Sequence, residues 1–272
     1  MSPGEGRTIE PGERVRIRIR FAKTGKIRWT SHRDLARMWE RAFRRTNLPL
    51  AYSSGFSPRP KVSFGLALPT GYESVAEYID VELVGTVDVA TLPFRLSVAL
   101  PEGVEATAAA VIPATAPSLQ EEVTACTWRW AAVPSDGAEP VTYDELAARV
   151  GRTLAASELL VTRSRKGAEQ TDDIRPGIIS LNIEGPSGPS GNTEGPAGPS
   201  DSDGFWLTGE LACRPRSIRP SEVILALGPG LEERHPRRLH QWIWRDGART
   251  EPLVIEGLAG TIGARHAEVR AS

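Results

Sequence analysis

Apolar and charged residues alternate strictly near the N-terminus of the chain. From residue 14 to residue 21 every second residue is apolar, and the positions between are all arginine. Successive side chains of a strand point to opposite faces of its sheet. The segment therefore predicts a β-strand with one face for the core and one basic face. These residues are Val15, Ile17, Ile19 and Phe21, and Arg14, Arg16, Arg18 and Arg20.

The spacing changes to that of a helix after residue 31. Ser31 followed by Asp34 resembles a capping box, with Asp as a shorter substitute for the usual Glu. Apolar residues then recur at i, i+3, i+4, i+7 and i+8, which predicts an amphipathic helix that ends at Asn47 and Pro49. Its apolar stripe is made of Leu35, Met38, Trp39, Ala42 and Phe43. Its other side carries Arg33, Arg37, Arg41, Arg44 and Arg45.

Further patterns complete a first half of the chain. The predicted elements are strands at 61–68 (KVSFGLAL) and 76–83 (AEYIDVEL), a helix at 87–100 and a strand at 104–112. The resulting order β-α-β-β-α-β is that of the ferredoxin-like fold. We therefore predict one ferredoxin-like half over residues 14–116. The Gly-, Pro- and Glu-rich residues 1–13 are expected to be disordered.

A similar order begins again at Thr124. The predicted elements are strands at 126–133 and 158–165, a helix at 143–157, a hairpin of 177–184 with 205–213, and a helix at 219–228. They predict a second half over residues 117–228, and hence an α+β fold of two tandem ferredoxin-like halves with antiparallel sheets. The Gly- and Pro-rich stretch 185–204 is predicted to be a flexible hairpin loop, and residues 229–272 an irregular C-terminal tail.

Charge is distributed unevenly along a chain that is nearly neutral overall. The formal net charge of the 272 residues is −1, and the 40% hydrophobic and 25% charged content is that of an ordinary globular protein. Between Arg14 and Lys61, however, there are fourteen Lys or Arg residues and only two acids, Asp34 and Glu40, so this stretch carries +12 and the remainder −13. Such a concentration of positive charge predicts a polyanionic partner, with nucleic acid the first choice.

Several classes of protein and site are not expected. Cys126 and Cys213 are the only cysteines, lie far apart in the sequence and have no histidine nearby. A disulfide framework, a zinc knuckle or an iron–sulfur ligand set therefore cannot be built from them, and we predict no metal and no cofactor. Because neither a secretion signal nor a long apolar run is present, the chain is expected to be cytoplasmic, with no membrane partner.

The arginines of the first strand have two explanations. Asp80 and Glu82 are expected to face outward from the third strand, where they would neutralise some of these arginines across the sheet. Small outward residues of the next strand, Ser63, Gly65 and Ala67, would leave room for a ligand. We favour an RNA surface that follows the phosphates. Its expected contacts are Arg16, Arg18, Lys23, Lys26, Arg37, Arg41, Arg44, Arg59 and Lys61.

Three aromatic residues and one histidine near the basic segment suggest further roles in RNA binding or cleavage. Trp29, Tyr52 and Phe56 lie in loops beside the basic segment, where they could stack on unpaired bases. His32, with Lys23 and Tyr52, is the candidate centre of a metal-independent ribonuclease, in which the histidine acts on the 2′-OH and the lysine stabilises the phosphorane. A scaffold whose basic face binds an acidic protein is the remaining alternative.

Residues 23–83 contain, in order, the patterns K-x-G, S-H-x-D-L, E-R-A-x-R-R, L-P-x-A-Y-S-x-G-F-x-P-x-P and E-Y-x-D-x-E-L. With these motifs the segment resembles an uncharacterised bacterial family known as radical-SAM-linked proteins. TRSRKGAEQTDDIRPGI at 162–178 resembles the second basic motif of that family. Two departures are Arg33, where an apolar residue is usual, and SPRP in place of N-P-H-P, which argues against a function that needs a histidine in this loop.

The resemblance implies a partnership with a radical-SAM enzyme encoded separately. This chain lacks the C-x3-C-x2-C set, so it could not hold the [4Fe–4S] cluster of such an enzyme. The expected function is a non-catalytic RNA-binding accessory protein that presents RNA for modification or processing. A second RNA-binding patch is expected at Arg163, Arg165, Lys166 and Arg175.

Overall fold

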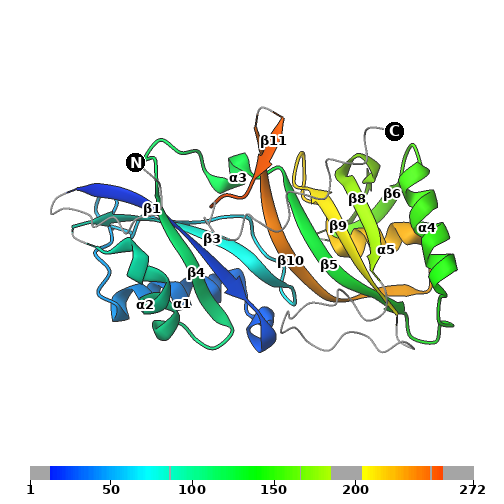
Figure 1. The fold of residues 1–272 in the computed structure, drawn as a ribbon, viewed down its shortest axis with the longest axis horizontal. Helices are drawn as coiled ribbons and strands as arrows, with labels where there is room; N and C mark the ends of the chain where they lie inside the picture. Colours follow the sequence, from blue (N-terminus) through cyan, green and yellow to red (C-terminus); the bar gives the residue numbers. More distant parts are fainter. Residues whose placement is uncertain (1–12, 86, 166, 185–203, 246, 254–272) are drawn as a thin grey trace. The chain divides into compact units, whose positions relative to one another are not determined.

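The structure of the chain is a computed structural model, which describes residues 13–85, 87–165, 167–184, 204–245 and 247–253 (Figure 1). It divides into two compact units. Unit 1 comprises Met1–Ala67, Ala76–Glu122 and Ile243–Ser272, and unit 2 comprises Leu68–Val75 and Val123–Trp242. The predicted α+β class with mainly antiparallel sheets is confirmed. The predicted disorder of residues 1–12, the flexible loop over 185–203 and the end of the tail, 254–272, lie outside the described residues.

Unit 1 is built on a sheet with the strand order β4-β1-β3-β2. Strand β1 pairs antiparallel with β4, and β2 pairs antiparallel with β3. The elements are β1 (Arg14–Lys23), η1 (Gly25–Trp29), α1 (His32–Arg45), β2 (Val62–Phe64), β3 (Glu73–Val84), η2 (Val89–Thr91), α2 (Leu92–Ala99), β4 (Val104–Ile112), α3 (Leu119–Glu122) and β11 (Ala248–Thr250). The first residues of β3, 73–75, are grouped with unit 2.

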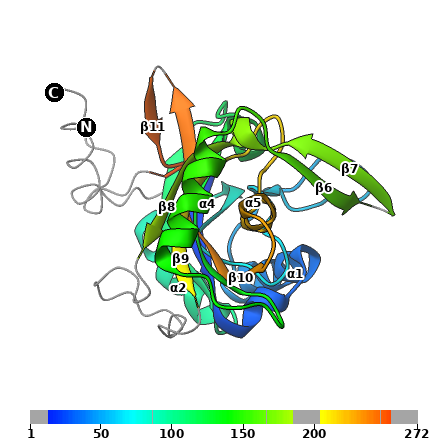
Figure 2. The ribbon, with the colours of Figure 1, turned by 90° about the vertical axis from the view of Figure 1, so that its right-hand side faces the viewer.

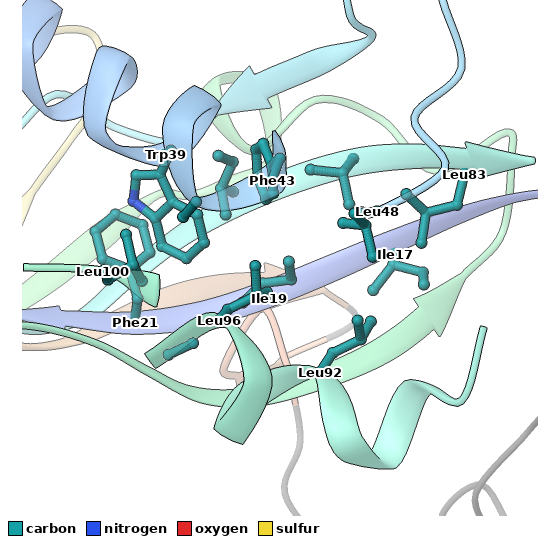
Figure 3. Packing of buried hydrophobic residues seen from close by; sticks show 14 of the residues in the cluster. Ile17, Ile19, Phe21, Trp39, Phe43, Leu48, Leu83, Leu92, Leu96 and Leu100 are labelled. Atoms are coloured by element: carbon teal, nitrogen blue, oxygen red, sulfur yellow. The ribbon is translucent and has the colours of Figure 1, made fainter. Parts of the chain in front are cut away.

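Helices α1 and α2 cover one face of this sheet and enclose the core of unit 1 (Figure 3). The apolar positions of β1 point toward them, as the alternation predicted. Phe21 and Trp39 meet edge to face with ring centroids 5.0 Å apart. The Ser31 hydroxyl accepts a hydrogen bond from the Asp34 N–H, so the predicted N-terminal cap of α1 is confirmed. The large side chains of this core include Ile17, Ile19, Phe21, Trp39, Phe43, Leu83, Leu92 and Leu96.

The other face of the sheet is not open along β1, contrary to the expectation of an accessible row of arginines. Arg18 and Tyr78 point to this face, yet only 3% and 1% of their surfaces are exposed. Two segments remote in sequence lie over it. Arg16 Nη1 donates to the carbonyl of Ala116 at 2.5 Å, and Arg18 Nη1 donates to that of Pro252 at 3.2 Å.

The room expected above Ser63, Gly65 and Ala67, in β2 and just after it, is also partly filled. A Cβ placed on Gly65 would lie 3.2 Å from Leu119 Cδ1 and 3.4 Å from the carbonyl oxygen of Tyr78. Glycine at this position therefore allows α3 to approach the strand closely, rather than leaving space for a ligand.

Alkaline unfolding tests the covered environment of Tyr78. Burial raises the pKa of its phenol first, Glu251 raises it further, and Arg20 and Arg18 oppose this rise. The unfolded chain therefore loses the Tyr78 proton near pH 10 while the folded chain keeps it, so the free energy of unfolding falls above pH 10 by up to about 1.4 kcal/mol per pH unit. Urea unfolding between pH 9 and 11 should show this additional slope in the wild type and not in Tyr78→Phe. Equal slopes would contradict the burial of this hydroxyl.

Unit 2 is built on a sheet with the strand order β10-β5-β9-β8. Helices α4 and α5 lie in front of this sheet in Figure 2, and the β6–β7 hairpin extends away from α4. The elements are β5 (Ala125–Pro134), α4 (Tyr143–Ala155), β6 (Leu160–Arg165), β7 (Ala168–Asp173), η3 (Arg175–Gly177), β8 (Ile178–Glu184), β9 (Phe205–Ala212), α5 (Pro220–Leu227) and β10 (Leu231–Arg245). The strand predicted at 158–165 corresponds to β6, which pairs only with β7 in a separate two-stranded sheet.

The prediction of an irregular tail from residue 229 is wrong for residues 231–245, which form β10. The strand LEERHPRRLHQWIWR lacks a clean alternation, because its register on β5 shifts twice, around Pro236 and again before His240. Its charges have partners within unit 2 instead. Arg237 pairs with Glu73 at 2.5 Å, and the Tyr72 hydroxyl donates to Glu233 at 2.6 Å.

The division predicted at residue 116 also differs from the observed one, since residues 68–75 belong to unit 2 and residues 243–253 to unit 1.

Candidate nucleic-acid interface

Asp80 holds two of the four β1 arginines in an internal ion-pair network. Arg18 Nε and Nη2 donate to the two oxygens of Asp80 at 2.8 and 3.0 Å, and Arg16 Nη2 donates to Oδ2 at 2.7 Å. Two parallel N–H···O bonds are the strongest geometry for this kind of pair. The expectation that a carboxylate of the third strand neutralises some of these arginines is thus correct for Asp80. The expectation that Arg18 contacts RNA is wrong, because its guanidinium is buried.

Lys23 is likewise removed from the expected surface. Only 1% of the residue is exposed, and its Nζ donates to the carbonyls of Arg28 at 3.2 Å and Thr30 at 3.0 Å. Burial lowers the pKa of this ammonium, and Glu77 opposes that effect. Lys23 therefore fixes the end of η1 and cannot reach a phosphate or a reacting atom.

Helix α1 carries four arginines in one stripe, the α1 arginine stripe, made of Arg33, Arg37, Arg41 and Arg44. At 100° per residue they fall within an arc of about 80°, and they span about 16 Å along the helix axis. The stripe lies opposite the buried side chains of Leu35, Trp39 and Ala42. All four arginines are exposed. Among the described residues only Arg37 has an acidic partner, Asp34 at 3.2 Å, and that pair is half exposed.

A tight loop presents Phe56 beyond the end of α1. Ser53 and Arg59 close the loop, because the Ser53 N–H donates to the Arg59 carbonyl at 2.9 Å and the Arg59 N–H donates to Ser53 Oγ at 3.0 Å. Gly55 adopts a φ of 128°, which glycine tolerates and other residues rarely adopt. The Phe56 side chain at the tip is fully exposed, and Tyr52 at the base is 51% exposed. The loop thus holds two aromatic rings ready for stacking.

The short helix η1 places a third exposed ring just before α1. Trp29 is 64% exposed, and the Arg28 guanidinium lies 5.3 Å from the centre of its ring. Lys26 on the same turn is exposed. The carbonyl contacts of Lys23 on either side of Trp29 position this ring.

A small cavity of about 230 Å³ lies beside β2. Its lining includes two cationic and two anionic side chains, and the Lys61 ammonium donates to Glu82 at 2.8 Å. Arg16 and Lys61 are therefore both ion-paired, although Lys61 remains 39% exposed. The polar lining residues are Arg16, Lys61, Ser63, Asp80 and Glu82.

The residues of the candidate ribonuclease centre are not brought together in an accessible site. His32 is exposed at the start of α1, where its ring packs edge to face on Phe64 with centroids 5.0 Å apart. Tyr52 is exposed in the loop, whereas Lys23 is buried. The lysine that would stabilise the phosphorane therefore cannot contact it.

A family described as "Uncharacterized protein conserved in bacteria (DUF2344)" matches residues 16–197. The chain belongs to this family. The match begins in β1 and includes the α1 arginine stripe and the Phe56 loop. A comparison with curated proteins found no match.

Three solved structures show limited similarity to this chain. A chain of a Cbf5-Nop10-Gar1 complex is 11% identical with a TM-score of 0.42, and the similarity covers 88% of this chain and 56% of that one. A chain of an H/ACA ribonucleoprotein bound to a substrate RNA is 14% identical with a TM-score of 0.36, covering 87% and 46%. A chain of an archaeal Nop10-Cbf5 complex is 12% identical with a TM-score of 0.39, covering 87% and 54%. The present chain spans about half the length of these chains, and at such scores the similarity establishes neither a common fold nor a common function.

The second predicted patch of the DUF2344 chain is largely engaged within unit 2. Arg163 pairs with Asp172 at 3.1 Å. Arg175 donates to the carbonyls of Ile178 at 3.0 Å and Leu154 at 2.8 Å, so it connects α4 to β8. The side chain of Arg165 is not described, and Lys166 lies outside the described residues. Arg175 therefore has a structural role in unit 2.

Two cysteines that the sequence left far apart are neighbours in unit 2. Cys126 Sγ and Cys213 Sγ are 3.4 Å apart. Only the pairing of β5 with β9 brings them together, and no local pattern in the sequence signals it.

Among the described residues, no cluster of three or more His, Cys, Asp or Glu side chains could hold a metal ion. None of the helices in the described part of the chain has the length and apolar character needed to cross a bilayer.

Proposed function

We propose that this protein is a non-catalytic RNA-binding module that acts in the cytoplasm with a separately encoded radical-SAM enzyme, in RNA modification or processing. The α1 arginine stripe is the observation that carries the RNA part of the proposal. Four arginines point away from the core along one face, and a helix has no structural need for such mutual repulsion. Within the described residues Asp34 pairs with Arg37 and also interacts with Arg33, and phosphates would supply counter-charge for the rest of the stripe.

The aromatic residues favour unpaired RNA over a duplex as the ligand. Trp29 precedes the stripe and Phe56 follows it, and both rings are exposed. Stacking on a ring requires a base that is free of its own neighbours, so phosphates along the stripe and bases on the rings fit a single strand or a loop.

The other parts of the proposal rest on different observations. The partnership with a radical-SAM enzyme is supported by the resemblance carried by residues 23–83. We also infer that the two units are tandem ferredoxin-like halves, because the first, second, third and last strands of each main sheet occur in the same spatial order, β4-β1-β3-β2 and β10-β5-β9-β8. In this interpretation the β6–β7 hairpin is an insertion in the second half.

Binding of a labelled single-stranded RNA across a salt series tests the function. Six exposed cations, Lys26, Arg33, Arg37, Arg41, Arg44 and Arg59, are available for phosphate contacts. If all six engage, log K should fall with log[salt] with a slope of roughly −4 to −5. A flat dependence, or no binding at low salt, would overturn the RNA proposal and favour an acidic protein partner.

Phe56→Ala is expected to weaken single-stranded RNA binding by about 1–3 kcal/mol, the usual contribution of one stacked base. Binding of a duplex of the same length should change much less, since its bases are already stacked. The measurement is fluorescence anisotropy with both RNAs at one salt concentration. Phe94→Ala is the matched control, because Phe94 is 75% exposed on α2, outside the interface. Equal losses for the two variants would argue against stacking on Phe56.

A further inference from the structure

Backbone pairing in unit 2 fixes the separation of its two cysteines. Cys126 lies in β5, and Cys213 directly follows β9. The register of these strands pairs Cys126 with Leu211, and the Cys213 N–H donates to the Thr124 carbonyl at 2.7 Å. Strand pairing therefore brings the two side chains to one place, where the Sγ atoms are 3.4 Å apart.

We propose that Cys126 and Cys213 form a redox site, at which a hydroperoxide converts the two thiols into an intramolecular disulfide. The S–S bond of a disulfide is about 2.05 Å long, so the two sulfurs need to approach by roughly 1.4 Å. Because Cys213 is two residues beyond the partner of Cys126, closure of the bond requires rotation about the Cα–Cβ bonds together with a local shift of the chain at Cys213, just after the paired residues of β9 end. The proposal concerns unit 2 and does not depend on RNA binding.

The surroundings of the two thiols give them different roles. Cys126 is 1% exposed, whereas Cys213 is partly exposed. The hydrogen bond with Cys126 lowers the pKa of the Cys213 thiol most, burial opposes this, and Arg238 and Arg214 lower it further. Because the thiolate is the reactive form, Cys213 is the residue that meets the oxidant, and Cys126 is the residue that resolves the product.

The reaction balances in two steps. The Cys213 thiolate attacks one oxygen of hydrogen peroxide, the O–O bond breaks, and one proton is taken up to give a sulfenic acid and water. The Cys126 sulfur then attacks the sulfenic sulfur, the S–O bond breaks, and the hydroxide leaves with the Cys126 proton as a second water. The thiol pair loses two electrons, and the peroxide gains two.

Graded hydrogen peroxide treatment of the reduced full-length chain, followed by intact mass and non-reducing peptide mapping, tests the proposal. The expected product is a monomer lighter by about 2 Da, the mass of two hydrogens, with no free thiol and one peptide that joins Cys126 to Cys213. Dithiothreitol should restore the original mass. Persistence of both thiols, oxidation to sulfinic acid, or a disulfide between two chains would each overturn the proposal.

Single variants separate the two roles. In Cys126→Ser the Cys213 sulfenic acid should persist and be trapped by a dimedone probe, whereas Cys213→Ser should give little trapped product. Trapping mainly at Cys126 would overturn the assignment of Cys213 as the first site. Circular dichroism of both variants checks that unit 2 remains folded, and the wild-type mass measurement tests the disulfide even if a variant fails to fold.

Discussion

Asp80→Asn is expected to lower the free energy of unfolding of unit 1 by about 3–5 kcal/mol, the usual cost of removing one partner from a buried ion pair. Arg18 and Asp80 are 3% and 4% exposed. Asparagine keeps the shape of the side chain but removes the negative charge, so the Arg18 guanidinium would stay buried beside a neutral amide. Arg16, which also donates to Asp80, loses the same partner. Urea unfolding followed by far-UV circular dichroism measures the loss.

Glu82→Gln on the same strand is the matched control for this prediction. Glu82 pairs with Lys61, and these side chains are 33% and 39% exposed. Water screens such a pair, so its loss should cost about 1 kcal/mol or less. The double variant Arg18→Met/Asp80→Asn should lose less than the sum of its single variants, since neither member of the Arg18–Asp80 pair is then left charged without the other. Similar losses for Asp80→Asn and Glu82→Gln would show that burial does not set the strength of the network.

Replacing the whole α1 arginine stripe by alanine is expected to weaken RNA binding roughly 30- to 800-fold. Each exposed charge pair contributes about 0.5–1 kcal/mol, so four pairs contribute roughly 2–4 kcal/mol. The slope of log K against log[salt] should become shallower by about 3, since each phosphate contact with a single strand contributes about 0.7. Both quantities come from one anisotropy titration series. The folded state should be retained, because the stripe lies opposite the buried face of α1.

Arg152→Ala on α4 provides the control for loss of an exposed helical arginine. Arg152 is exposed near the end of α4 in unit 2, outside the proposed interface. Arg41→Ala should reduce the salt slope by about 0.7, whereas Arg152→Ala should leave it unchanged. Equal effects of these two substitutions would mean that RNA responds to total charge rather than to the stripe. An unchanged slope in the fourfold variant would exclude α1 from the interface.

The candidate site could be predicted in part. The helix at 32–45, its cap and its two faces follow from residue spacing. The exposed rings of Trp29 and Phe56 follow from their place between the long elements, although Trp29 lies in η1 rather than in a loop.

Arg18 was misplaced because alternation assigns it to the face of the strand opposite the core but carries no information about what covers that face. The covering groups, such as the carbonyls of Ala116 and Pro252, come from segments far along the chain. Lys23 was misplaced because it was expected in an open turn, whereas its ammonium folds back onto the carbonyls of Arg28 and Thr30.

By itself the sequence determined the elements whose hydrophobic period is clear, the α+β class and the position of the α1 arginine stripe, because each depends on residues a few positions apart. Only the tertiary structure decided that Arg18 is buried against Asp80, that residues 231–245 form a strand and that Cys126 meets Cys213. These features depend on pairing between distant segments. Such pairing is stabilised by contacts between residues far apart in the sequence, and the pattern of a short segment does not identify those residues.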